Sequence, residues 1–314
     1  MKKIVSWVIL IICLYFLFRK VDFKIVKNIF FQANWFLVFI YFFLGFFIFF
    51  IKVYRWKVIL SYVKDIRFVT LFEILGFAQL ISFVFPFRVG DIIQIFSLSA
   101  RENISKTIVL ASIIWYQLLD IILILVVSFY VSGYITMSKF LFLRKYIFLI
   151  LFFLILFLIF YRKIFEFLKL KIKVLNDKIE LIQVALREFT SFFSLLKAAF
   201  LTIFIFVINC FVTYLFFKGF RINISLFGLL SFLSIPCLVV LIPVTPGHWG
   251  TWDLVSVSVL RIFNVGKEVA LGCVFTMHFI MMLHISLYGV IAFLKNNDIL
   301  FFLKTMQKNK IKIK

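Results

Sequence analysis

Long runs of apolar residues separated by short polar stretches dominate the hydropathy pattern of this 314-residue chain. A helical crossing of a bilayer needs about 20 mainly apolar residues. Eight segments are predicted on this basis to be membrane helices: residues 4–18, 35–51, 68–85, 107–131, 140–161, 198–217, 226–242 and 268–294. Two shorter apolar segments, residues 92–100 and 251–262, follow directly after breaks that contain proline and glycine. The pattern therefore predicts an all-α, polytopic membrane bundle that forms one domain over residues 1–314.

The one substantial polar stretch lies at residues 162–197. Its apolar positions recur at helical spacing, as in Ile179, Ile182 and Leu186, while charged residues occupy other positions. This pattern predicts an amphipathic helix on the cytoplasmic membrane surface. Residues 295–314 are predicted to form a basic C-terminal tail.

Composition agrees with a membrane protein, since 65% of the residues are hydrophobic and 15% are charged. Soluble domains are about half apolar and a quarter charged. The net charge of +22 and the 48 phenylalanines could also suggest nucleic-acid binding. However, the cations gather at the ends of apolar segments and the phenylalanines lie inside them, so no nucleic-acid partner is expected.

The distribution of Lys and Arg favours one topology over another. If all eight segments cross the membrane, these residues divide almost equally between its two sides. If residues 68–100 and 226–262 are instead re-entrant hairpins, the cytoplasmic side holds about twice as many as the outside. We therefore expect six full crossings and two hairpins, with both termini in the cytoplasm. The expected location is the plasma or inner membrane of the cell. Eight transmembrane helices remain the alternative.

The two breaks, "PFRVGD" at residues 86–91 and "PVTPGHWGTWD" at residues 243–253, are the predicted hairpin tips. A pair of apolar segments interrupted by Gly and Pro is a sequence pointer to a transporter's midplane binding site. Non-helical backbone at that depth is tolerated where it is buried in protein or lines a water-filled cavity. Helix starts after such breaks direct N–H groups toward the cavity, which suits a phosphate or carboxylate.

Ionisable groups inside a membrane segment are functional candidates by default, because they are costly to place there. The candidate substrate-binding residues are Glu73, Arg88, Asp91, Asp120, His248 and Asp253. The candidate turn-forming residues are Pro86, Gly90, Pro243, Pro246, Gly247 and Gly250.

Each charged candidate also has a structural interpretation. Arg88 and Asp91 could form an ion pair that pins the first tip. Asp253 could instead serve the first turn of the helix over residues 251–262. Glu73 and Asp120 could neutralise internal cations without touching substrate, and His248 could be a spacer.

No metal or other cofactor is predicted. The four cysteines, Cys13, Cys210, Cys237 and Cys273, are widely spaced, and no pair has the spacing of a zinc or redox motif. The sequence has neither a P-loop nor a Rossmann glycine pattern. ATP-driven transport by this chain alone is therefore not expected.

These motifs resemble those of the flippase-like transmembrane region of lysylphosphatidylglycerol synthases and related stand-alone membrane proteins. The "P-x-R-x-G-[DE]" element is matched by Pro86, Arg88, Gly90 and Asp91, and an acid in the following span is matched by Asp120. The "P-x-x-P-G-G-x-G-x-x-E" element is matched by Pro243, Pro246, Gly247, Gly250 and Asp253. The "YRW" at residues 54–56 resembles an early Arg-Trp element.

The departures from this pattern bear on the substrate more than on the fold. His248 stands where the second glycine is usual, and Asp253 replaces the usual glutamate. The resemblance implies that the protein moves or handles a charged lipid. In the bifunctional members a soluble C-terminal domain performs aminoacyl transfer, and about 20 residues follow the last predicted span here. Synthase activity of this chain alone is therefore not expected.

Three classes of function stay open at this point. The leading one is a lipid translocator that binds a phosphate-bearing headgroup, with a membrane lipid of anionic headgroup as its partner. The second is a membrane glycosyl- or acyl-transferase that acts on a lipid carrier, although its short loops lack a D-x-D metal motif. The third is a non-catalytic protein that presents lipid to a partner enzyme.

Overall fold

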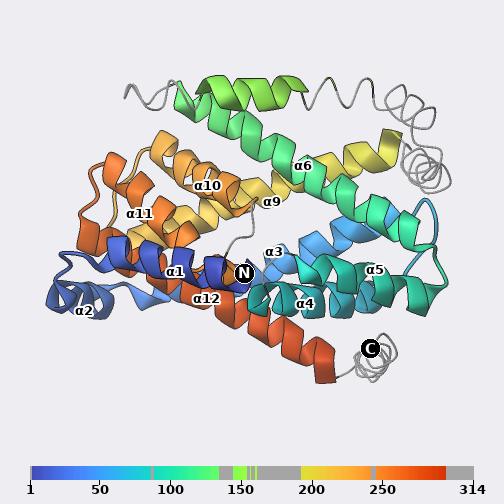
Figure 1. Ribbon diagram of the computed structural model, residues 1–314, viewed down its shortest axis with the longest axis horizontal. Coiled ribbons are helices and arrows are strands. Elements are labelled where there is room, and N and C mark those ends of the chain that lie inside the picture. The colour runs from blue at the N-terminus through green and yellow to red at the C-terminus, as the bar shows by residue number, and fades with distance from the viewer. Residues whose placement is uncertain are drawn as a thin grey trace.

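The computed structural model describes residues 2–85, 88–133, 144–153, 156, 160, 192–241 and 245–294 (Figure 1). Within these residues the chain forms helices, turns and short connections, and contains no strand. The predicted all-α membrane bundle is confirmed. Pro86 and Pro243, most of the predicted surface helix and the predicted tail lie outside the described residues.

Among the described residues, four long helices have the length and hydropathy needed to cross a bilayer. They are α3 (Trp35–Leu60), α6 (Lys106–Ser132), α9 (Phe192–Gly219) and α12 (Lys267–Leu294). The shortest of them, α3, has 26 residues, which corresponds to about 39 Å of helix and exceeds the hydrocarbon thickness of a bilayer. Residues 192–197, placed in the surface helix by the sequence pattern, form the start of α9.

Four shorter helices form two pairs. α4 (Phe68–Val84) packs against α5 (Val89–Glu102), and α10 (Leu226–Val240) packs against α11 (Thr251–Ile262). They contain 17, 14, 15 and 12 residues, so each is shorter than the length typical of a full crossing. These are the helix–break–helix pairs that the hairpin interpretation requires.

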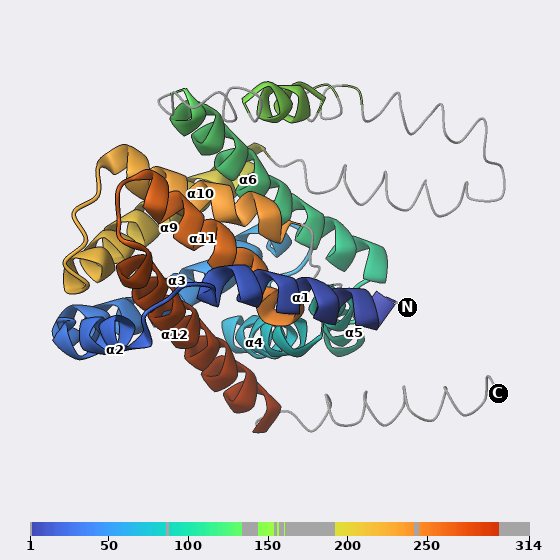
Figure 2. The same ribbon diagram turned by 60° about the vertical axis from the view of Figure 1, so that its left-hand side comes forward.

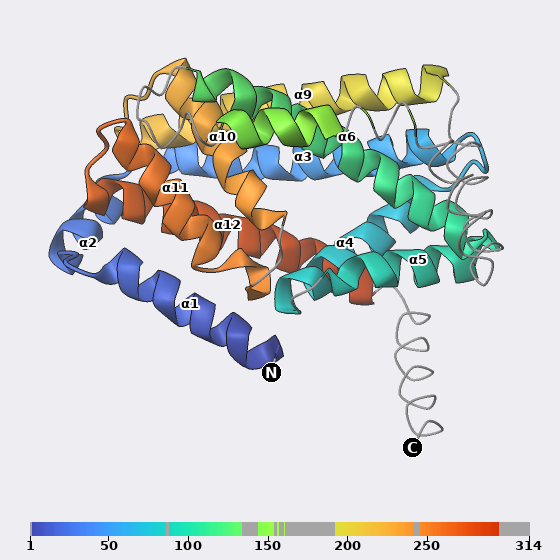
Figure 3. The ribbon, with the colours of Figure 1, turned by 45° about the horizontal axis from the view of Figure 1, so that its top comes forward.

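The two hairpins occupy opposite ends of the molecule, and their tips meet near its middle (Figure 3). The second tip contains the short 3₁₀ helix η2 (Pro246–His248), which contacts α4. A Cβ atom built on Gly247 would lie 2.7 Å from the ring of Phe83, so a larger residue at this position would displace that ring.

The order long, short, short, long occurs twice along the chain, once over α3–α6 and once over α9–α12. The contacts between helices repeat as well: α4 packs on α12, and its counterpart α10 packs on α6. The first helices of the two halves, α3 and α9, pack along each other and run antiparallel (Figures 1 and 3). The two halves therefore form an inverted repeat, an architecture found in many secondary transporters.

Two further helices lie beside the second hairpin (Figure 2). α1 (Lys2–Phe18) packs on α11, and α2 (Phe23–Gln32) packs on α12. The sequence pattern did not predict α2, whose N-cap residue Asp22 accepts a hydrogen bond from the Lys24 N–H at 2.8 Å. With 17 residues α1 is shorter than the four long helices, so its full crossing stays a prediction, as does the crossing over residues 140–161.

Apolar packing gathers in two main clusters on either side of the hairpin tips. One includes Phe216, Phe217 and Phe232 beside the second hairpin, and the other includes Trp56 and Leu71 beside the first. The side chains between the clusters are more polar. The two cores therefore hold the hairpins in place while leaving polar groups at their junction.

The opposite openings of the hairpins predict opposite membrane accessibility. Ser61 lies in the connection before the first hairpin and Asn223 in the connection before the second, and both are exposed. In a parent in which the four cysteines are replaced by serine, Ser61→Cys and Asn223→Cys should react with an impermeant maleimide from opposite sides of the membrane. Labelling of both from one side would contradict the arrangement, and the cysteine-free parent should remain unlabelled.

Candidate functional site

Two adjoining cavities lie where the hairpin tips meet. The larger, which we term the central cavity, has a volume of about 560 Å³ and is lined by groups from α3, α4, α9, α12 and both tips, among them Arg88 and His248. The smaller, which we term the polar chamber, has a volume of about 200 Å³ and lies among α3, α4, α5 and α6. Lys52, Gln79 and Ser82 line both, so the cavities share a wall.

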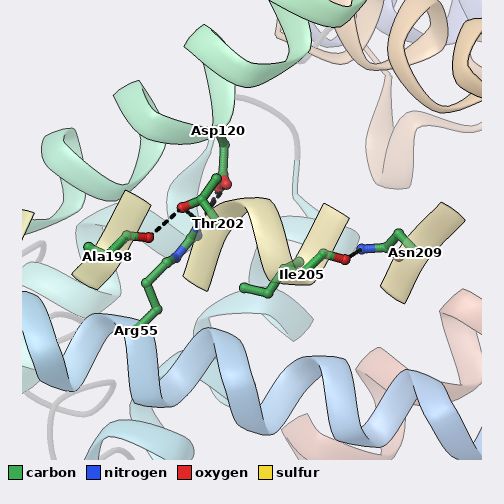
Figure 4. A network of polar contacts seen from close by, with 6 residues as sticks. All are labelled: Arg55, Asp120, Ala198, Thr202, Ile205 and Asn209. Carbon is green, nitrogen blue, oxygen red and sulfur yellow. Dashed lines mark hydrogen bonds and ion pairs between the residues drawn. The ribbon is translucent and has the colours of Figure 1, made fainter. Parts of the chain in front are cut away.

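Asp120 lines the polar chamber and is held by Arg55 (Figure 4). Nη1 of Arg55 donates to Oδ1 of Asp120 at 2.5 Å, and Nη2 donates to Oδ2 at 2.9 Å. Such two-pronged pairs are strong and orientationally specific. Nη1 also donates to the hydroxyl of Thr202 at 2.7 Å. The pair therefore ties α3, α6 and α9 together, and a cation neutralises Asp120, as its structural interpretation required.

The first tip is organised around Gln117 of α6. Nη1 of Arg88 donates to Oε1 of Gln117 at 2.8 Å, and Nε2 of Gln117 donates to Oδ2 of Asp91 at 3.1 Å. Arg88 and Asp91 lie 3.9 Å apart, so their ion pair is long and the amide bridges it. Arg88 faces the central cavity, whereas Asp91 faces the polar chamber. The two charges are thus both partnered and accessible from a cavity.

The backbone at the first tip is close-packed. Arg88 has a left-handed conformation with φ of 53° and immediately precedes α5. The Gly90 N–H donates to the hydroxyl of Ser82 at 3.1 Å. Any side chain at Gly90 would collide with the Ala78 carbonyl and with Ser82. Glycine is therefore required for α5 to approach α4 at the tip.

The second tip is attached to α12 by a buried carboxylate–imidazole pair. Asp253 and His278 are both fully buried, with Oδ1 and Nδ1 separated by 2.7 Å. Oδ2 of Asp253 accepts the Gly250 N–H at 2.8 Å, and Nε2 of His278 lies 3.1 Å from the Gly247 carbonyl oxygen. Both ring nitrogens of His278 therefore have an oxygen partner at the second tip. The buried contact between Asp253 and His278 therefore fixes the second tip to α12.

The remaining predicted site residues lie at different places. Glu73 pairs with Arg101 at 3.0 Å between α4 and α5, and neither side chain lines the two cavities. His248 lines the central cavity, and its Nδ1 is buried without a hydrogen-bond partner among the described residues. Asp253 lies behind the second tip and outside both cavities. The six candidates therefore separate into four that line a cavity and two that do not.

Sequence reasoning missed Lys52, Arg55 and His278 as parts of this region. The predicted span over residues 35–51 was too short, because α3 continues to Leu60 and carries Lys52 and Arg55 inside the bundle. The signal available was a pair of cations three residues apart, which share one helix face. His278 lies 25 residues from Asp253 along the chain, and nothing in the local sequence connects them.

The family model described as "Lysylphosphatidylglycerol synthase TM region" matches residues 3–289. The chain belongs to this family. Neither a curated protein nor a solved structure gives a significant match. Membership of the lysylphosphatidylglycerol synthase transmembrane family indicates a membrane domain related to lipid modification or lipid flipping.

The buried pair at the second tip predicts a large effect on stability. Asp253→Ala leaves Nδ1 of His278 and the Gly250 N–H without their buried partner, and should lower the free energy of unfolding by about 3 kcal/mol or more. Thermal unfolding of purified protein in detergent would measure the change. Ser256→Ala is the matched control, because Ser256 lies one turn further along α11, is buried and has a hydroxyl without a partner among the described residues. Equal stability of the two variants would contradict the role of the pair.

Proposed function

We propose that this protein is a lipid translocator that binds a phosphate-bearing headgroup in the central cavity while the lipid tails stay in the bilayer. The observation that carries the proposal is the composition of that cavity's wall. Groups from both hairpin tips line it, and they include the guanidinium of Arg88. Apolar residues such as Ile48, Val212 and Met281 line other parts of the same cavity. A ligand with both a charged and an apolar portion fits this lining.

The first tip supplies features suited to an anion. A guanidinium carries five N–H donors in a planar fork. The hydrogen bond from Arg88 to Gln117 uses a donor on Nη1, so in the proposal the other donors bind the phosphate. Arg88 immediately precedes α5, and the start of a helix carries partial positive charge. In the proposal, Arg88 contacts the phosphate, and Asp91 and Asp120 set the field around it.

The inverted repeat supports movement of the lipid between the two leaflets. In transporters built this way, one repeat or bundle rocks against the other around a fixed site near the bilayer midplane. Here the hairpins extend from opposite ends and meet beside the central cavity (Figure 3). Separation of Gly247 from Phe83 would open the contact between the two tips and expose the site to one side of the membrane. The proposed orientation follows the positive-inside rule, with both termini in the cytoplasm of the cell.

A translocation assay tests the proposal. Protein in liposomes should accelerate loss of fluorescence from a headgroup-labelled phosphoglycerolipid when an impermeant quencher is added outside. Arg88→Ala removes a charged hydrogen-bond donor and should slow the initial rate by about tenfold or more. The control is Arg261→Ala, which removes an exposed arginine near the end of α11.

The outcomes separate the proposal from its alternatives. Loss of transport in the Arg88 variant but not in the Arg261 variant, with both proteins folded, would support it. Absence of protein-dependent transport for anionic, zwitterionic and polyprenyl-phosphate lipids would overturn it. Equal rates for wild type and the Arg88 variant would remove Arg88 from the substrate path.

A further inference from the structure

The backbone of His248 at the second tip is strained. Its φ of 60° is left-handed, and the other positive φ values in the tip, 55° and 76°, belong to Gly247 and Gly250. A residue with a Cβ atom costs about 1–3 kcal/mol in this conformation and persists there when the surrounding structure holds it. The His248 N–H donates to the Thr245 carbonyl oxygen at 3.1 Å, which closes the turn. The tip therefore holds this ring at the wall of the central cavity despite an energetic cost.

The ring of His248 also lacks a partner for one of its nitrogens. Nδ1 is buried and makes no hydrogen bond with the described residues. The other two histidines differ, since both ring nitrogens of His278 have oxygen partners and Nε2 of His284 lies 2.6 Å from the Phe42 carbonyl oxygen. A buried polar atom without a partner costs about 1–3 kcal/mol. Two separate costs at one residue favour a functional role for His248.

The charged groups that share the central cavity with His248 are cations. Arg88 contributes from the first tip and Lys52 from α3. Among the described residues, no carboxylate lines this cavity. The other polar or titratable side chains of its wall are Tyr41 on α3, Gln79 and Ser82 on α4, Asn209 on α9, and His284 and Tyr288 on α12. The wall thus gathers positive charge around a ring that can accept a proton.

The carboxylates near the tips are engaged elsewhere. Asp91 and Asp120 line the polar chamber, and side chains of α6 and α3 donate hydrogen bonds to them. Asp253 lies behind the second tip, against His278, and outside both cavities. The described groups of the protein thus supply no counter-ion for a His248 cation, whereas a guest with negative charge would supply one.

We propose that His248 is a proton-binding site linked to the anion site: when a phosphate-bearing guest enters the central cavity, the imidazole takes up one proton. The proton comes from the water to which the cavity is open, and the neutral ring becomes an imidazolium with both nitrogens as donors. The guest anion is its counter-ion. Anion and proton then favour each other's binding equally, since linkage between two sites is reciprocal. This inference rests on the proposed function, because it assigns a coupling ion to the same cavity.

The linkage supplies a driving force for transport. In a cavity that opens to the two sides of the membrane in turn, the anion and the proton are carried in the same direction. A pH gradient then favours movement of the lipid from the more acidic side to the less acidic side. His248 directly follows Gly247, whose separation from Phe83 opens the contact between the tips in the proposed function, so the proton site moves with that contact.

Calorimetry of the full-length chain in dodecyl maltoside counts the proton directly. Dihexanoyl phosphatidylglycerol would be titrated at about pH 6.5, the ordinary titration range of imidazole, in buffers that differ in their enthalpy of ionisation. A phosphodiester has no group that titrates near neutral pH, so the dependence of the observed enthalpy on the buffer reports protons taken up by the protein. Wild type should take up about 0.5–1 proton per lipid bound. No uptake, or no binding of this probe, would overturn the inference.

Substitutions test the assignment to this residue. His248→Asn removes the titratable ring, and asparagine tolerates a left-handed backbone, so proton uptake should fall below about 0.2 per lipid bound. His248→Gly, which relieves the strained φ, is a second variant without an imidazole and should give the same result. His284→Gln, at the other histidine of the cavity wall, should keep the wild-type uptake. Retained uptake in the His248 variants, or its loss in His284→Gln alone, would overturn the inference.

A pH gradient across liposomes separates this inference from the proposed function. With an impermeant quencher outside, a headgroup-labelled phosphoglycerolipid of the inner leaflet should lose fluorescence faster when the interior is acidic than when the exterior is. Nigericin should remove the difference, and the two rates should be equal in His248→Asn. Proton-linked binding without any transport would overturn the proposed function alone. Transport by wild type at a rate that ignores the gradient would overturn this inference alone.

Discussion

A backbone that leaves the helical conformation inside a bilayer must find hydrogen-bond partners within the protein, because hydrocarbon offers none. Backbone groups in the described residues of both breaks find such partners nearby. At the first tip the Gly90 N–H uses the hydroxyl of Ser82. At the second, the Gly250 N–H uses Asp253 and the Gly247 carbonyl faces His278. The need to satisfy these groups explains why each tip is anchored to a helix beside it.

Charged side chains in the interior also find partners within the protein. The cavity region contains several ionised side chains, and most of them are paired across helices that are distant in sequence. Arg55 joins α3 to Asp120 on α6 and to Thr202 on α9 (Figure 4). His278 joins α12 to the second tip through Asp253. These bonds link long helices to broken ones, so the electrostatics of the site and the packing of the bundle depend on the same few residues.

The inverted repeat gives this arrangement a mechanical consequence. Each hairpin packs its first arm on the last long helix of the other half, as α4 does on α12 and α10 on α6. A movement of one half relative to the other would therefore shift both tips together. Glycines set how closely these elements approach: Gly90 allows α5 to lie against α4 within the first hairpin, and Gly247 allows the second tip to lie against Phe83. Family membership connects this architecture to lipid modification or flipping.

The sequence by itself determined the fold class and the positions of the breaks. Both depend on local properties, since the length of an apolar segment decides whether it can span a bilayer and Pro and Gly interrupt helices. It also predicted Arg88, Asp91 and Asp120 as candidate site residues, since a charged residue in an apolar segment is conspicuous. It could not distinguish the cavity-lining Asp120 from the buried Asp253, because both are single acids in apolar surroundings. Only the tertiary structure decided that His278 partners Asp253, that Arg55 neutralises Asp120 and that Lys52 is left at a cavity wall. Each of these depends on which helices pack together, and such long-range pairing leaves no trace in local hydropathy.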